Sequence, residues 1–102
     1  MLRVKIHSAY RKIVAVSDPE LLGKRFEKGN MQLEVKEAFY GGSGSQLIEE
    51  NKVIELLKEE DADDAVFNFV GKNAVAAGIK AGVIAKEGVM KIDVVQHALG
   101  LL

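Results

Sequence analysis

The strict alternation of polar and apolar residues at the N-terminus constrains the fold more than any other feature of the sequence. In Leu2–His7 every second residue is apolar, and the residues between them are Arg3, Lys5 and His7. This period of two is typical of a strand with one buried face. A second apolar run, Lys12–Val16, follows after a short link, so the two segments are predicted to pair as an antiparallel hairpin.

Three further strands and two main helices are expected along the rest of the chain. The predicted strands are Met31–Val35, Ala65–Val70 and Val89–Ile92, and the predicted helices are Ser45–Glu60 and Gly71–Gly82. Apolar residues recur at helical spacing in both helices. The sequence therefore predicts one α+β domain over residues 1–102, with a mixed sheet of about five strands that starts with the N-terminal hairpin and carries two main helices.

Local signals predict a short helix and a connection after the hairpin. Asp18 is expected to cap the helix Asp18–Gly23, Pro19 suits its first turn and Gly23 its left-handed end. Lys24–Asn30 is expected to be a polar connection. At the other end of the chain, Asp93–Leu102 is interpreted either as a further strand or as an apolar tail that docks on a partner.

Composition excludes several classes of function. With 14 basic and 15 acidic residues the net charge is −1, which argues against a protein dominated by phosphate neutralisation. The chain has no cysteine, so disulfides and zinc–cysteine sites are excluded and a cytoplasmic location is expected. No apolar run approaches the roughly 18–20 residues that span a bilayer. The acidic run Glu59–Asp64 lacks the pattern of a calcium loop, and no cofactor or metal is predicted.

The glycine-rich stretch Phe39–Gly44 is the first candidate site. Gly41 and Gly42 allow a ligand to approach the backbone closely, but their spacing matches neither a dinucleotide fingerprint nor a phosphate loop. The alternative is a flexible loop without a ligand. Phe39 is expected in the core and Tyr40 at the surface.

Lys24 and Arg25, with Lys28, form the only local basic cluster. If the rings of Phe39 and Tyr40 lie beside it, the basic cluster and the two rings together would suit single-stranded RNA. A solvated connection is the plainer interpretation.

The remaining candidates are an amide and the two histidines. His7 is expected to be exposed on the polar face of its strand. Asn68 needs hydrogen-bond partners if it is buried, and serves either the structure or a site. His97 lies among apolar residues, either as a buried structural group or as a functional base. One hypothesis places Tyr40, Asn68 and His97 around a single pocket.

Several segments, taken in order, resemble the archaeal domain-of-unknown-function 424 family. They are Asp18–Lys24, Leu33–Val35 with Phe39–Gly42, Asn68–Gly71 and His97–Ala98. The chain departs from the family pattern at Val95 and Gln96, where that pattern has a glycine and a proline. The resemblance implies a small cytosolic archaeal protein without an established activity, and an association of such proteins with translation.

The leading hypothesis is a non-enzymatic binding module whose partner is RNA or a translation factor. Its candidate binding residues are Lys24, Arg25, Tyr40, Gly41, Gly42, Asn68 and His97. The alternative is a small enzyme or ligand-binding domain with a pocket near Tyr40, Asn68 and His97. A third hypothesis is a homo-oligomer in which the C-terminal segment Ala98–Leu102 is buried against a second copy.

Overall fold

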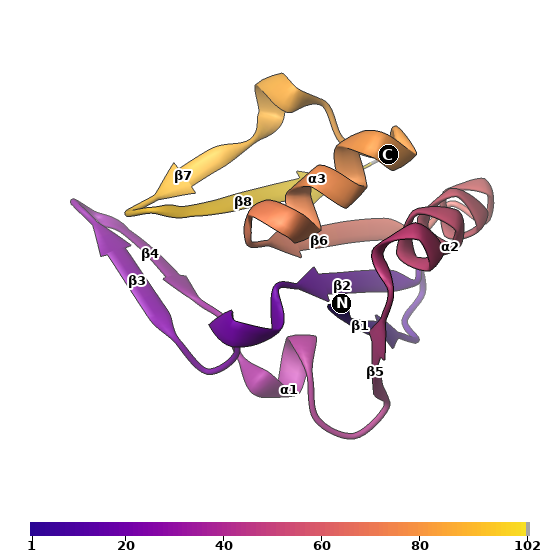
Figure 1. The fold of residues 1–102 in the computed structure, drawn as a ribbon, viewed down its shortest axis with the longest axis horizontal. Helices are drawn as coiled ribbons and strands as arrows, with labels where there is room; N and C mark the ends of the chain where they lie inside the picture. The colour runs from indigo at the N-terminus through magenta and orange to yellow at the C-terminus, as the bar shows by residue number, and fades with distance from the viewer. Residues whose placement is uncertain (102) are drawn as a thin grey trace.

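A mixed sheet of six strands forms the centre of the computed structural model, which describes residues 1–101 (Figure 1). The strands are β1 (Leu2–His7), β2 (Ile13–Ser17), β5 (Ser45–Ile48), β6 (Val66–Val70), β7 (Met90–Ile92) and β8 (Val95–Gly100). Their order in the sheet is β5-β1-β2-β6-β8-β7, with β2 and β6 parallel and the other neighbours antiparallel. The predicted α+β class and the N-terminal hairpin are confirmed.

Two layers cover the two faces of this sheet. Helices α2 (Glu50–Ala62) and α3 (Lys72–Ala81) pack on one face. The other face carries the 3₁₀ turn η1 (Pro19–Leu21), the hairpin of β3 (Arg25–Lys28) with β4 (Met31–Glu34), and the one-turn helix α1 (Glu37–Tyr40). A second 3₁₀ turn, η2 (Lys86–Gly88), leads into β7. Figure 1 shows α2 and α3 together on one side, and α1 with the hairpin on the other.

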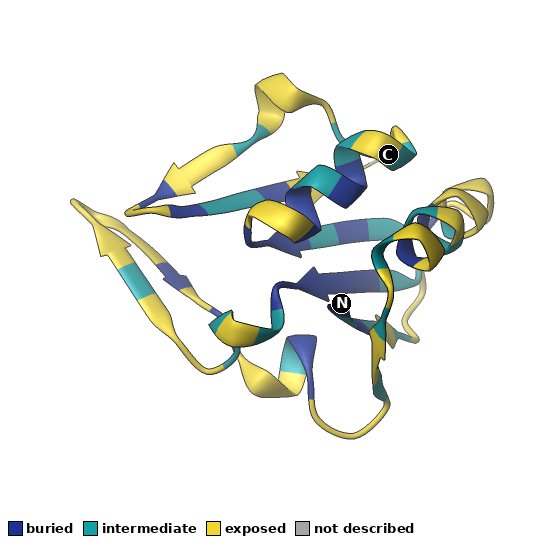
Figure 2. Cartoon of the chain, in the orientation of Figure 1, coloured by how far each residue is buried: buried dark blue, intermediate teal, exposed yellow. Residues whose placement is uncertain are grey.

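Each covered face has its own apolar core, because alternate residues of a strand point to opposite faces. Under the helices the core is built from Leu2, Val14, Val16, Val53, Leu57, Phe67, Phe69 and Val75, among others. On the other face it is built from Ala15, Leu33, Val35, Tyr40, Val70, Ile92 and Val95. Figure 2 shows that burial is concentrated in the central strands, whereas the β3–β4 hairpin is exposed along most of its length.

One predicted boundary and one predicted strand position were wrong, the first because pairing with a strand distant in sequence overrides local sequence preference. The helix expected from Ser45 begins at Glu50, and Ser45–Ile48 is instead the edge strand β5, which pairs with β1. The strand expected at Met31–Val35 exists as β4 but lies outside the main sheet. Its partner β3 lies in the segment that was expected to be an irregular connection.

The C-terminal segment is a strand and not a docking tail. Strand β8 lies between β6 and β7 and is antiparallel to both. The segments β6, α3 and β7 therefore do not form a crossover between neighbouring strands. Ala98 is buried, while Leu99 and Leu101 are 50% and 72% exposed. The last residue of the predicted oligomer segment, Leu102, lies outside the described residues, and the oligomer hypothesis stays untested.

Candidate functional site

Asn68 is the central residue of a polar cluster on the sheet face opposite α2 and α3. It lies on β6 between Phe67 and Phe69, whose rings belong to the core under the helices, so its side chain points to the other face. The Tyr40 hydroxyl donates a hydrogen bond of 2.8 Å to Asn68 Oδ1. His97 Nε2 lies 3.3 Å from the same oxygen. The structure thus brings together Tyr40 from α1, Asn68 from β6 and His97 from β8.

The shared acceptor determines which nitrogen of His97 carries the proton. Asn68 Oδ1 can only accept, so His97 donates through Nε2 and its Nδ1 is left as an acceptor. Within residues 1–101 no group is hydrogen-bonded to Nδ1. Burial lowers the pKa of His97 below its ordinary 6.5 and raises the pKa of Tyr40 to about 12. The cluster is therefore neutral at pH 7.

Strand β1 positions Tyr40 by holding the end of α1. The last carbonyls of a helix lack partners within that helix. Lys5 Nζ donates to the Ala38 carbonyl at 2.8 Å, and His7 Nε2 lies 2.7 Å from the Phe39 carbonyl. The His7 ring also stacks on Phe39, with ring centroids 4.7 Å apart. His7 was expected to be exposed, but it is half-buried because its strand face is covered by α1.

The expected exposure of Tyr40 was wrong, whereas Phe39 packs against the core as expected but is only partly buried. Tyr40 is only 4% exposed, and Phe39 is the half-buried residue of the pair. The two rings meet edge to face with centroids 4.9 Å apart. The helical turn directs Tyr40 into the core next to Val70 and Ile92, where its hydroxyl finds Asn68.

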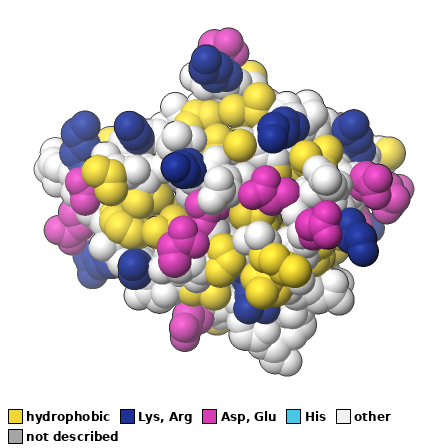
Figure 3. Space-filling model, in the orientation of Figure 1, with side chains coloured by type: hydrophobic (Ala, Val, Ile, Leu, Met, Phe, Trp, Pro, Cys, Tyr) yellow, Lys and Arg dark blue, Asp and Glu magenta, His cyan; other side chains and the backbone are white. Residues whose placement is uncertain are grey.

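A groove of about 460 Å³ lies between the β3–β4 hairpin and strands β7 and β8, and His97 contributes to its wall. We call it the His97 groove; its lining residues are Met31, Gln32, Leu33, Gly88, Met90, Ile92, His97, Ala98 and Leu99. None of these residues is Lys, Arg, Asp or Glu. Figure 3 shows hydrophobic side chains gathered between the two hairpins, with charged groups around them.

The predicted basic residues lie elsewhere. Lys24 and Arg25 are exposed at the base of the β3–β4 hairpin. Arg25 Nη2 donates to Gln32 Oε1 at 2.7 Å and lies 3.3 Å from Glu27 Oε1. Because Tyr40 is buried, its ring offers no exposed stacking surface beside them.

The two candidate glycines have different environments. Gly41 is buried, and a Cβ at this position would lie 3.0 Å from Leu22 Cδ1. Gly42 is exposed and has a φ of +71°, which favours glycine. Gly41 therefore serves close packing, and Gly42 serves the turn that leads into β5.

Asp18 has a partner that the sequence analysis missed. Its side chain makes no capping bond to η1. Instead, Asp18 Oδ1 and Oδ2 accept hydrogen bonds from the backbone amides of Ala74 (2.8 Å) and Asn73 (3.2 Å), at the start of α3. Gly71 makes this approach possible, because a Cβ there would collide with the Asp18 side chain. Burial raises the pKa of Asp18 above its ordinary value. The sequence indicated that Asp18 caps a helix, but the helix that it caps is α3, which follows β6, the strand next to β2.

Residues 1–101 contain neither a candidate metal site nor a helix suited to span a membrane. In this part of the chain no group of three or more His, Asp or Glu side chains is placed to hold a metal ion. None of its helices has both the length and the apolar character required to cross a membrane.

Comparison with known proteins places the chain among proteins without an assigned activity. Residues 6–101 match the profile of a family described as "Protein of unknown function (DUF424)". The fold is similar to the crystal structure of an uncharacterized conserved protein from Methanopyrus kandleri, with a TM-score of 0.81 and 21% sequence identity. That match covers 96% of this chain and 88% of the other. No curated protein sequence matches.

Proposed function

We propose a ligand-binding function for this chain, which belongs to the DUF424 family of proteins of unknown function. In this proposal the domain is a non-enzymatic module that binds a small organic ligand in the His97 groove. The observation that carries it is the hydrogen-bonded cluster of Tyr40, Asn68 and His97 beside an apolar groove of about 460 Å³. Pockets of roughly 300–1,000 Å³ with few polar groups and an apolar lining are typical of small-molecule sites.

The composition of the groove supports binding over a purely structural role. Met31, Met90 and Leu99 are 40%, 47% and 50% exposed, so a concave apolar surface faces solvent here. Methionine side chains are flexible and polarisable, and adapt to the shape of a ligand. His97 is the member of the polar cluster that lines the groove, and it offers a hydrogen-bonding group that can orient a ligand.

The RNA hypothesis has less support from the geometry. The burial of Tyr40 removes one of the two rings on which it partly depended, and leaves the half-buried Phe39 with the exposed Lys24 and Arg25 as its remaining basis. Binding of transfer RNA over a salt series tests it, because phosphate contacts weaken steeply as salt rises.

The three methionines give a direct test of the ligand-binding proposal. In protein labelled with ¹³C at the methionine methyl groups, Met31 and Met90 report on the His97 groove, whereas Met1 lies at a different cavity. A library of small neutral, cationic and anionic compounds is titrated into this protein. We expect at least one compound to shift Met31 and Met90 and to leave Met1 unchanged.

A matched pair of variants localises the binding. Leu99→Trp fills the groove, and Leu47→Trp places the same side chain on β5, away from the groove. The two leucines are similarly exposed, Leu99 at 50% and Leu47 at 46%. Binding should be lost in Leu99→Trp and kept in Leu47→Trp. If no compound shifts Met31 and Met90, or if Leu99→Trp binds as well as the wild type, the proposed function is wrong.

A further inference from the structure

The hydrogen-bond pattern around Asn68 leaves one acceptor without a partner beside the groove. Asn68 Oδ1 receives the Tyr40 hydroxyl at 2.8 Å and faces His97 Nε2 at 3.3 Å. The Tyr40 hydroxyl and the His97 Nε2–H are therefore used within the protein. The other donors of the cluster are the amide N–H groups of Asn68, and Asn68 does not line the groove. In residues 1–101 the His97 Nδ1 lone pair has no donor, although His97 is half-buried and contributes to the groove wall. Nδ1 is not among the buried side-chain atoms that lack a partner, so water can reach it, and a ligand that supplies a donor can replace that water.

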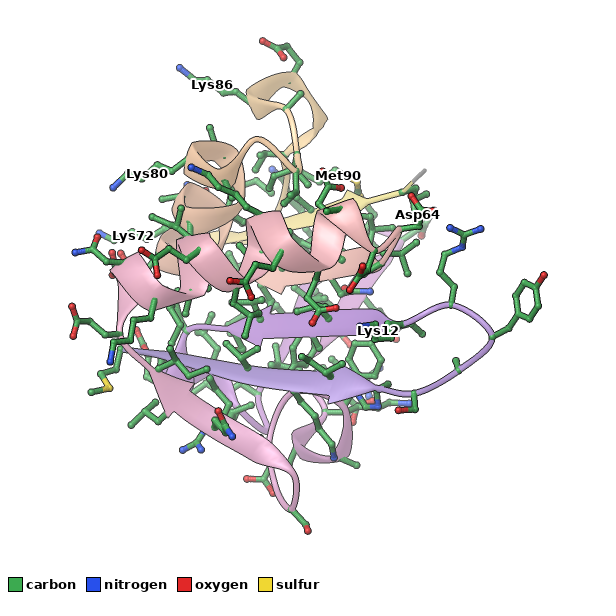
Figure 4. The ribbon with its side chains drawn as sticks, turned by 90° about the vertical axis from the view of Figure 1, so that its right-hand side faces the viewer. Lys12, Asp64, Lys72, Lys80, Lys86 and Met90 are labelled. Atoms are coloured by element: carbon green, nitrogen blue, oxygen red, sulfur yellow. The ribbon has the colours of Figure 1, made fainter. Side chains whose placement is uncertain are left out.

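The rest of the groove wall gives a charged ligand no counter-charge. The one polar side chain near the hairpin end, Gln32, already uses its carbonyl oxygen to accept from Arg25. Lysines from the α3 layer do not contribute to the lining. Figure 4 shows Lys72, Lys80 and Lys86 extending to the same side of the molecule, away from Met90 in that view. An ion that lost its hydration in this groove would have no charged partner in the lining, which is unfavourable.

We propose that the ligand of the His97 groove is a neutral, largely apolar molecule that carries an N–H or O–H donor, and that His97 Nδ1 accepts this donor. This inference rests on the proposed function and adds the chemical class of the ligand. The lowered pKa of His97 agrees with it, because a neutral imidazole keeps its acceptor at pH 7.

Three probes of similar size and shape test the chemical class. Indole is neutral and has one N–H donor, benzofuran has an oxygen in place of that N–H, and indole-3-carboxylate keeps the donor but adds a negative charge. Dissociation constants are measured from the Met31 methyl shift in wild-type protein, so no variant has to fold. We expect indole to bind about tenfold more tightly than benzofuran, and indole-3-carboxylate to bind more weakly than indole.

The failure of this inference is distinguishable from the failure of the proposed function. If other compounds shift Met31 and Met90 but indole does not bind, or binds no more tightly than benzofuran or indole-3-carboxylate, the chemical class is wrong and the groove remains a site. If no compound of any charge shifts these methyl groups, the proposed function itself fails. In His97→Phe, which keeps a planar ring without Nδ1, the preference for indole over benzofuran should disappear; an unchanged preference would overturn the role of His97.

Discussion

Tyr40 and Asn68 are 28 residues apart in sequence, and the Tyr40 hydroxyl donates a hydrogen bond of 2.8 Å to the Asn68 side chain. This bond joins α1 to the centre of the main sheet and places a donor next to His97. It also explains why a strand with phenylalanines on both sides of Asn68 tolerates a polar residue. The hydrogen bond makes the cluster a structural element, and His97 is the member of the cluster that lines the groove.

Removal of the Tyr40 hydroxyl should lower the free energy of unfolding by about 1 kcal/mol, which is typical of one partly buried hydrogen bond. The variant is Tyr40→Phe, and the measurement is urea denaturation. Tyr10 provides the matched control because its side chain is fully exposed at the turn between β1 and β2. Tyr10→Phe should leave the free energy of unfolding unchanged. Equal stability of the two variants would mean that the bond to Asn68 contributes nothing.

His97 should make the stability of the protein fall as the pH drops. Its pKa is lowered by burial, so the unfolded chain takes up the proton more readily than the folded one. The contribution of His97 is therefore present above pH 6.5 and is lost as the pH falls through the folded pKa. We expect the difference in free energy of unfolding between wild type and His97→Gln to decrease from pH 7.5 to pH 5. A constant difference over this range would contradict the burial of His97.

Asp18 should be important for stability although it lies far from α3 in sequence. Loss of its hydrogen bonds to the amides of Asn73 and Ala74 in Asp18→Ala should lower the free energy of unfolding by about 1–2 kcal/mol, as for other lost helix caps. In chemical denaturation, the control is Asp63→Ala, because Asp63 is exposed near the end of α2. Similar effects of the two substitutions would argue against the capping role.

The same aspartate gives a pH dependence of opposite sign. Because burial raises its pKa, the folded protein holds the Asp18 proton more tightly than the unfolded chain does. The stability that this group contributes is present below its unfolded pKa of 3.8 and is lost as the pH rises through the folded pKa. The advantage of wild type over Asp18→Asn should therefore be largest below pH 3.8 and should shrink as the pH rises. An advantage that grows with pH would show that the pKa is lowered instead.

Gly71 should tolerate no side chain. It has a φ of +103°, and a Cβ there would collide with the Asp18 carboxylate. Gly71→Ala should cost about 1–3 kcal/mol from backbone strain alone, whereas Gly88→Ala, which meets no atom within 4 Å, should be nearly neutral. The measurement is the midpoint of thermal unfolding. A double variant with Asp18→Ala should recover the part of the loss that comes from the collision, but not the part that comes from φ.

Local patterns predicted the elements whose partners are close in sequence. The alternation in Leu2–His7 identified β1, and Gly82 correctly marked the left-handed end of α3. Ser45–Ile48 was assigned to a helix because its strand character depends on β1, which is distant in sequence. Strand β4 was predicted, but its partner β3 was missed because only Phe26 is partly buried in β3, so the amphipathic signal there is weak.

In the candidate site, too, the residues were predictable from local sequence, whereas their contacts were not. Asn68 and His97 were identifiable as polar residues among apolar neighbours, and the hypothesis of a pocket named Tyr40 as well. Their hydrogen bonds depend on the sheet order, which places β8 beside β6, and on the contacts of Lys5 and His7 with α1. The sequence contained no local signal for these contacts. One wall of the groove is formed by the β3–β4 hairpin, and the pairing of these two strands was not predicted from the sequence.

The most direct test of the ligand-binding account is the ¹⁵N spectrum of the His97 imidazole during a titration with indole at pH 7. In the free protein the account predicts a neutral ring with the proton on Nε2 and an unprotonated Nδ1. On addition of indole, the Nδ1 resonance should move in the direction of hydrogen bonding while Nε2 stays bound to its proton. A ring protonated on Nδ1 in the free protein, or an Nδ1 resonance that does not respond while Met31 does, would contradict the account.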